Sequence, residues 1–239
     1  MIDLHCHIHP GVDDGCQTVD ESRALARALV NAGVTTAAAT SHVRPDKGWM
    51  NTRVDDAARR ARLASILDGI PLQIVGGAEH YMHEVVIGDA LVDIALPYGS
   101  SRWLLVETPY LGEPPNLLEL LHGIRKRGFK ILLAHVERFP YLEKHWQTIV
   151  DAGMIVQVNL GSLAGAYNRQ QQKAAERLLK EGFAGVLAGD CHREQDVADN
   201  IVAGRKAAKK IISDDVLERL TTTNPQRILD DASPAQVWP

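Results

Sequence analysis

A repeated alternation of helical and strand patterns runs along most of the chain. Stretches with apolar residues at helical spacing end in glycine, and a short apolar run follows each glycine, as at Asn31 to Val34 and Lys126 to Phe129. Glycine tolerates the left-handed backbone that ends a helix, so it is expected just past a helix C-terminus. The apolar runs then predict strands that are buried on both faces. Helix–strand alternation of this kind predicts a parallel sheet covered by helices.

The pattern predicts seven strands, at residues 1–7, 34–40, 72–76, 103–107, 130–135, 154–159 and 185–190. Helices are expected at 19–31, 54–67, 116–127, 141–152, 169–181 and 195–212, with shorter ones to about 229. Such a chain favours a distorted closed β/α barrel, and a doubly wound open sheet is the alternative. No linker divides the chain, so we expect one domain over residues 1–232 and a loose C-terminal tail over 233–239.

The composition is that of an ordinary globular protein and argues against several classes. Of 239 residues 45% are apolar and 23% charged, and the net charge is −4, which disfavours a nucleic-acid binder or a membrane-surface protein. The N-terminus has no basic region followed by an apolar stretch, and no segment approaches the ~20 apolar residues of a membrane span. Three cysteines form no disulfide framework. We therefore expect a cytoplasmic protein without membrane insertion.

Residue types that bind metals gather where the predicted strands end. His5 and His7 end the first strand two residues apart, so their side chains point the same way. Six of the seven strand ends carry such residues, and only the strand that ends near Asn159 does not. The positions are His5, His7, Asp13 or Asp14, His42, Glu79, Glu107, His135, Asp190 and His192. Since parallel barrel strands open on one face, where active sites lie, we predict one metal centre at that mouth.

The remaining histidines and the cysteines are interpreted as structural. Isolated histidines are usually hydrogen-bonded structural residues, and this reading applies to His9, His80, His83, His122 and His145. Cys6 lies between His5 and His7, so strand alternation turns its side chain away from them, and Cys191 is placed in the same way before His192. We expect both thiols to pack as small apolar groups. No arginine lies six residues after any cysteine, which leaves a cysteine-based phosphatase mechanism unsupported.

An ordered set of motifs resembles the PHP (polymerase and histidinol phosphatase) domain. The motifs are Ile2-Asp3-Leu4-His5-Cys6-His7, Val12-Asp13-Asp14-Gly15, Ala39-Thr40-Ser41-His42, Gly77-Ala78-Glu79, Val106-Glu107-Thr108-Pro109, Ala134-His135-Val136-Glu137-Arg138-Phe139, Gly189-Asp190-Cys191-His192 and Asn224-Pro225. Within that superfamily the chain most resembles the CpsB/CapC/YwqE-type bacterial manganese-dependent tyrosine-protein phosphatases, over nearly its whole length. The resemblance implies a distorted seven-stranded, TIM-like (β/α)7 barrel with its metal site at the C-terminal strand ends.

The resemblance also implies three divalent ions, usually manganese; the donor types would equally suit iron or zinc. It gives the first ion to His5, His7, Glu79 and Asp190. It gives the second to Glu79, Glu107 and His135. It gives the third to Asp14, His42 and His192, so the resemblance selects Asp14 over Asp13.

The resemblance further makes Arg138 a catalytic residue, whereas the residue pattern alone also allows an ion pair between Arg138 and Glu143. A second functional arginine of the family, downstream of the last ligand pair, aligns cleanly with neither Arg193 nor Arg205. The chain departs from the family pattern at positions that adjoin ligands and shape the substrate pocket, among them Ser41, Val43 and Val136.

Together these features predict a metal-dependent phosphomonoester hydrolase. A hydroxide that bridges the metals would attack phosphorus, while Arg138 binds phosphate oxygens. The resemblance implies a phosphotyrosine protein substrate, namely a bacterial tyrosine kinase of capsule or exopolysaccharide synthesis. The alternatives are a PHP phosphatase for a small metabolite such as histidinol phosphate, and a non-catalytic PHP-like regulatory subunit. Lost ligands would mark the latter, and every ligand position is filled.

Overall fold

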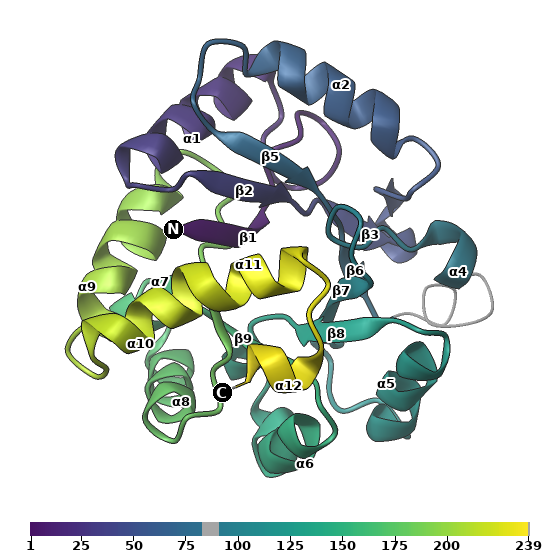
Figure 1. Ribbon diagram of the computed structural model, residues 1–239, viewed down its shortest axis with the longest axis vertical. Helices are drawn as coiled ribbons and strands as arrows, with labels where there is room; N and C mark the ends of the chain where they lie inside the picture. Colours follow the sequence, from purple (N-terminus) through teal and green to yellow (C-terminus); the bar gives the residue numbers. More distant parts are fainter. Residues whose placement is uncertain (83–90, 239) are drawn as a thin grey trace.

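The computed structural model describes residues 1–82 and 91–238, and it shows helices packed around a ring of parallel strands (Figure 1). The ring contains β1 (Ile2–Cys6), β2 (Thr36–Ala39), β5 (Gln73–Gly76), β7 (Trp103–Glu107), β8 (Lys130–Leu133), β9 (Ile155–Asn159) and β10 (Val186–Ala188). After short breaks, β2 is followed by β3 (His42–Arg44) and β5 by β6 (Glu79–Tyr81). A two-residue strand, β4 (Trp49–Met50), pairs antiparallel with β3.

The ring is built from two hydrogen-bonded sheets, β1-β2-β5 and β10-β9-β8-β7-β6-β3-β4. The breaks that divide these sheets are held together by Asn51, whose amide donates to the carbonyls of Ser41 and Gly77 at 2.9 and 3.1 Å. The first and last strands meet at a parallel bridge between Cys6 and Cys191. Because the ring of strands closes through this one bridge rather than a full ladder of hydrogen bonds, the fold is the distorted β/α barrel that the sequence predicts. The alternative of a doubly wound open sheet is wrong.

Most predicted helices are present on the outside of the ring: α1 (Val19–Asn31), α2 (Asp56–Ile66), α5 (Leu117–Lys126), α6 (Trp146–Asp151), α8 (Arg169–Lys180), α9 (Gly204–Ala208) and α10 (Asp214–Glu218). Two predicted helices are irregular at their start. The first half of 141–152 is the 3-10 segment η3 (Pro140–His145), and 195–212 contains the π-helical segment η4 (Val197–Ala203) before α9. The sequence did not predict α4 (Leu91–Ile94) or α7 (Leu160–Ala164). No helix in the described residues is long and apolar enough to cross a membrane.

Buried apolar side chains form an inner and an outer layer. Leu105, Leu132 and Val186 belong to the cluster that fills the ring, whereas their neighbours Leu104 and Leu187 belong to the layer beneath the helices. This division follows from strand alternation, which sends successive side chains to opposite faces. The three cysteines are free and buried in the outer layer, which confirms the packing role predicted for Cys6 and Cys191.

The C-terminal segment covers the end of the barrel at which the strands begin. In Figure 1, α11 (Asn224–Leu229) and α12 (Pro234–Val237) cross in front of the barrel, on the side where the chain begins. Val237 is fully buried in the inner cluster, and Trp238 packs against it. Residues 233–238 therefore form an ordered plug where a loose tail was expected, because their apolar side chains cover the open end of the ring; Pro239 lies outside the described residues.

Candidate metal centre

The nine predicted ligand positions converge at the C-terminal ends of the strands. The described residues contain four groups whose potential ligand atoms all lie within 4.8 Å of one another, and these groups use all nine positions. The groups are His7, Asp14, His42 and His192; His5, His7 and Asp190; His5, Glu79 and His135; and His42, Glu79 and Glu107. Shared members join the groups into one cluster, which we call the ligand cluster.

Glu79, at the start of β6, lies at the centre of the ligand cluster. Its Oε2 is 3.0 Å from His5 Nε2 and 3.2 Å from His42 Nδ1, and its Oε1 is 2.9 Å from His135 Nε2. Burial opposes ionisation of this carboxyl, but the neighbouring His5 and His42 hold the pKa of Glu79 well below its usual range. A buried carboxylate with imidazoles on both oxygens is suited to bridge two cations.

Asp190 forms the opposite side of the ligand cluster. Its Oδ1 lies 3.3 Å from His5 Nε2 and 3.4 Å from His7 Nε2. Asp190 has a backbone φ of 53° and His135 has one of 29°, in the left-handed region that residues other than glycine seldom adopt. Backbone strain of this kind concentrates at functional sites, where the surrounding structure enforces it.

The two adjacent aspartates after β1 have different positions. Asp14 is half-exposed, and its Oδ1 lies 3.6 Å from His42 Nε2 and 3.4 Å from His192 Nε2. Asp13 is buried behind the cluster, where its Oδ2 accepts hydrogen bonds from His7 Nδ1 at 2.7 Å and from the His42 amide at 2.8 Å. A side chain at Gly15 would come within 2.2 Å of the His7 carbonyl oxygen, so this tight turn requires glycine. Asp14 therefore faces the ligand cluster and Asp13 orients one of its histidines.

Glu107 provides a test of whether the cluster suits a cation. It is fully buried, yet neither of its oxygens meets hydrogen-bond geometry with another described residue. Burial and the charge of Glu79 raise the pKa of Glu107 to about 8. Two buried carboxylates side by side are unfavourable without compensation, and a divalent ion between them would supply it. The cluster's imidazoles and carboxylates, without thiolate, suit manganese, iron or zinc.

β9 supplies two residues that the sequence analysis missed. Gln157 Oε1 accepts from His5 Nδ1 at 3.0 Å, and Gln157 Nε2 donates to Asn159 Oδ1 at 2.5 Å. Asn159 Nδ2 then donates to Asp190 Oδ2 at 2.8 Å. This strand end offered no strong ligand, but two amides at alternate positions were the signal for a supporting role. The chain of hydrogen bonds orients two members of the ligand cluster from behind.

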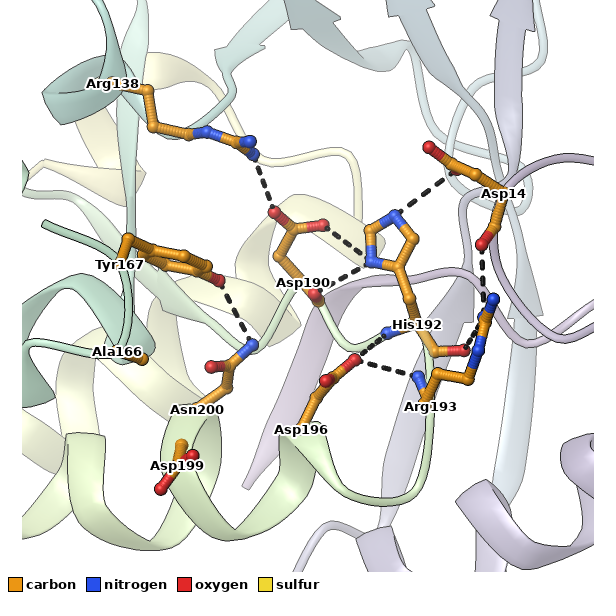
Figure 2. Close-up of a pocket in the computed structure, with 10 residues that line it drawn as sticks. All are labelled: Asp14, Arg138, Ala166, Tyr167, Asp190, His192, Arg193, Asp196, Asp199 and Asn200. Carbon is orange, nitrogen blue, oxygen red and sulfur yellow. Dashed lines mark hydrogen bonds and ion pairs between the residues drawn. The ribbon is translucent and has the colours of Figure 1, made fainter.

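A pocket of about 370 Å³ opens beside the ligand cluster and is lined by Asp14, Arg138, Tyr167, Asp190, His192 and Arg193, among others (Figure 2). Arg138 Nη1 lies 3.2 Å from Asp190 Oδ2, whereas Glu143 pairs with Arg177 instead. The alternative pairing of Arg138 with Glu143 is therefore wrong. Arg138 stands at the edge of the cluster, facing the pocket.

The two arginines considered downstream of the last ligand pair have backbone partners. Arg193 Nη1 donates to the carbonyls of Asp14, Gly15 and His192, so it ties the loop after β1 to the end of β10. Arg205, on α9, donates to the carbonyl of Ala32 at the end of α1. Arg193 thus borders the pocket as a support for Asp14, and Arg205 lies away from it.

The histidines interpreted as structural stay outside the ligand cluster where the structure describes them. His9 and His80 are buried, His122 is exposed, and His145 pairs with Glu113 at 2.7 Å. His83 lies outside the described residues.

Comparison with known proteins gives matches over most of the chain. The sequence matches the family described as capsular polysaccharide synthesis, CpsB/CapC, over residues 1–230. The tyrosine-protein phosphatase YwqE of Bacillus subtilis is 29% identical over 197 residues, which cover 80% of this chain and 77% of YwqE. The tyrosine-protein phosphatase CpsB of Streptococcus pneumoniae is 29% identical over 251 residues, which cover 97% of this chain and 99% of CpsB.

Solved structures show the same architecture. One solved structure superposes on this chain with a TM-score of 0.87 at 26% identity, and the match covers 98% of this chain and 96% of that one. It is described among the crystal structures of YwqE from Bacillus subtilis and CpsB from Streptococcus pneumoniae, unique metal-dependent tyrosine phosphatases. A phosphotriesterase homology protein from Escherichia coli, with a TM-score of 0.56 at 12% identity over 90% of this chain and 92% of that one, shares the fold.

Proposed function

The chain belongs to the CpsB/CapC family of capsular polysaccharide synthesis, and we propose that it is a metal-dependent phosphatase that hydrolyses phosphotyrosine in proteins. The observation that carries this proposal is the buried ligand cluster, in which nine metal-binding side chains meet beside a pocket that Arg138 borders. Relatives with 29% identity are tyrosine-protein phosphatases. A structural neighbour with a TM-score of 0.87 is described as metal-dependent.

The ligand cluster would hold three divalent ions, with manganese as the first candidate and iron or zinc as alternatives. We assign the ions to three sets: His5, His7, Glu79 and Asp190; Glu79, Glu107 and His135; and Asp14, His42 and His192. The groups of ligand atoms support the first and third sets, and the second set rests on Glu79 with His135 at 2.9 Å and on Glu107, which lies 3.7 Å from His135. Bound ions of this kind supply a nucleophile by lowering the pKa of water and polarise phosphoryl oxygens.

The protein's own side chains prepare the phosphate for reaction. Arg138 presents a planar guanidinium at the cluster edge, where it can bind two phosphate oxygens and stabilise the charge that develops on them. Asp13 and Gln157 accept hydrogen bonds from the Nδ1 atoms of His7 and His5, so each ring directs Nε2 into the cluster. A phenolate leaves readily from phosphotyrosine, so the reaction requires no dedicated acid.

The phosphotyrosine protein that we propose as substrate is a tyrosine kinase of capsule or exopolysaccharide synthesis. The family description supports a role in capsule synthesis, and the names of the relatives support a phosphotyrosine protein as substrate. Three free, buried cysteines suit a reducing compartment, and we place the reaction in the cytoplasm.

Substrate competition tests the proposal. The Mn²⁺-loaded protein should have a higher kcat/KM for a phosphotyrosine peptide than for histidinol phosphate. His42→Ala and Asp190→Ala should abolish turnover while retaining the fold, and His122→Ala, at an exposed histidine of α5, is the matched control. Preference for histidinol phosphate would favour the small-metabolite alternative. Failure to bind transition metal or to hydrolyse p-nitrophenyl phosphate with Mn²⁺ would favour a regulatory protein.

A further inference from the structure

Two arginines and three tyrosines form a continuous row along one edge of the ligand cluster. The Cζ atom of Arg44 lies 4.1 Å from the ring centroid of Tyr81 and 5.8 Å from that of Tyr110. The Cζ atom of Arg138 lies 5.4 Å from the centroid of Tyr110 and 5.8 Å from that of Tyr167. Tyr110 thus contacts both guanidinium groups. We call these five residues the arginine–tyrosine row.

The two guanidinium groups approach the ligand cluster at different points. Arg138 Nη1 lies 3.2 Å from Asp190 Oδ2, and Arg44 Nη1 lies 3.9 Å from Glu107 Oε2. Arg44 follows His42 by two positions on β3, so strand alternation sends both side chains to the same face. The cluster therefore has one arginine at its Asp190 side and another at its Glu107 side.

Arg44 is held firmly but is not neutralised by Glu107. Its Nε donates to Asp46 Oδ1 at 3.3 Å and to Oδ2 at 3.4 Å, and its face stacks on Tyr81, which together fix the guanidinium plane. The distance of 3.9 Å to Glu107 exceeds the roughly 2.7–2.9 Å of a charge-assisted hydrogen bond. The Nη1 edge therefore keeps donor capacity toward the cluster.

The charges at this edge favour an anion. On the proposed function, three divalent ions carry more charge than the four carboxylates of the cluster can neutralise, and the ions' own charge must be counted in such a site. Arg138 adds to that surplus, and Arg44, whose charge Asp46 offsets, adds hydrogen-bond donors at the same edge. An anion with several oxygens would relieve it, and a phosphate group has the geometry that guanidinium forks match.

We propose that Arg44 is a second phosphate-binding residue, which acts together with Arg138 on the oxygens of the phosphate ester. Tyr81 and Tyr110 position the guanidinium group of Arg44. This inference rests on the proposed function and deepens it. Arg44 binds the phosphate from the Glu107 side and Arg138 binds it from the Asp190 side. Arg205 lies away from the pocket, and the Nη1 group of Arg193 is engaged by backbone carbonyls.

Calorimetric binding of inorganic phosphate to the Mn²⁺-loaded protein tests the role of Arg44 without depending on turnover. Arg44→Gln should weaken phosphate binding about 10- to 100-fold, because it removes charged hydrogen bonds. Arg44→Lys should give an intermediate loss, because it keeps the charge but not the fork. Arg205→Gln is the matched control and should bind phosphate like the wild type. Metal content and melting temperature are measured for each protein, and Tyr81→Leu should weaken binding severalfold without altering any charge.

The outcomes separate this inference from the proposed function. Phosphate affinity of both Arg44→Gln and Arg44→Lys equal to that of the wild type would overturn the role of Arg44, even if the wild type hydrolyses phosphotyrosine peptides. A wild type that binds phosphate but does not hydrolyse those peptides would overturn the proposed function, while a loss in Arg44→Gln would still support the phosphate site.

Discussion

At the scale of single residues, members of the ligand cluster are oriented by partners that do not face the proposed metals. Asp13 accepts from His7, Gln157 accepts from His5, and Asn159 donates to Asp190. Such partners fix the tautomer and the ring orientation of metal-binding histidines and fix the rotamers of carboxylates. The precision of this site therefore depends on residues that the ligand pattern itself does not include.

Replacement of Asn159 tests this dependence. Asn159→Ala removes the donor to Asp190 and leaves the Gln157 amide without its acceptor, so we expect a loss of about 10- to 100-fold in Mn²⁺ affinity or turnover. Asn168→Ala is the control, because Asn168 caps α8 and should affect stability by only about 1 kcal/mol. Titration with Mn²⁺ and turnover of p-nitrophenyl phosphate measure the effect. Wild-type values for Asn159→Ala would show that the hydrogen-bond chain is dispensable.

At the scale of elements, β6 connects the ligand cluster to the surrounding barrel. Glu79 points into the cluster, whereas the next side chain, His80, is buried on the other face. His80 Nδ1 donates to the Leu105 carbonyl at 3.0 Å and Nε2 accepts from the Leu96 amide at 3.1 Å. The bond that Nε2 accepts requires a neutral imidazole, and burial lowers the pKa of His80 to about 4.

His80 should make the stability of the metal-free protein depend on pH. Its folded-state pKa of about 4 lies below the ordinary value of 6.5, so the unfolded chain binds more protons between these values. The contribution of His80 to the free energy of unfolding is complete above pH 6.5 and is lost as the pH falls toward 4, by up to about 1.4 kcal/mol per pH unit.

Urea denaturation between pH 7 and pH 5, with a chelator present, measures this contribution. The free energy of unfolding should change less with pH in His80→Gln than in the wild type, whereas His122→Gln should match the wild type. An unchanged slope in His80→Gln would contradict a neutral buried His80.

The C-terminal plug should contribute stability without contributing to the site. Val237 is fully buried inside the ring, at the end opposite the ligand cluster. Val237→Ala should lower the free energy of unfolding by roughly 1.5–3 kcal/mol and leave turnover per folded molecule unchanged. Val54→Ala, at a valine that is 78% exposed, is the control for urea denaturation. Equal stability of the two variants would mean that the plug is not packed.

At the scale of the whole molecule, the ligand cluster joins strands that are distant in the chain. The groups connect β1, β3, β6 and β7 with the segments that follow β8 and β10, and the ring itself closes by one bridge between Cys6 and Cys191. Bound cations would therefore hold together a barrel whose backbone closure is weak, since any ligand that binds only the folded state stabilises it.

Metal addition should raise the melting temperature of the chelator-treated protein. A free Mn²⁺ concentration of 100 times Kd stabilises the folded state by about 2.7 kcal/mol, which corresponds to roughly 5–10 °C for a domain of this size. A variant with both His42→Ala and Asp190→Ala should show a much smaller rise, because each proposed ion set except one loses a ligand. Calorimetry at several Mn²⁺ concentrations checks this, and equal rises in the two proteins would place the bound metal elsewhere.

The sequence by itself determined the barrel and the strand ends where the nine metal-binding residue types gather. Apolar runs and helix-ending glycines report local backbone geometry, so α1 and β7 have the predicted bounds. Since all parallel strands open on one face, the order of elements was enough to bring His5 and Asp190 together, and the family match confirms the resemblance that the motifs indicated.

Only the tertiary structure decided which side chains support those ligands. It placed Asp13 behind His7 and directed Arg44 toward Glu107, although nothing near either residue in the chain indicates its partner. It also packed Val237 into the ring, where a loose tail was expected. The physical reason is that residue patterns report the face on which a side chain lies, whereas these roles depend on what another segment presents across a few ångströms of space.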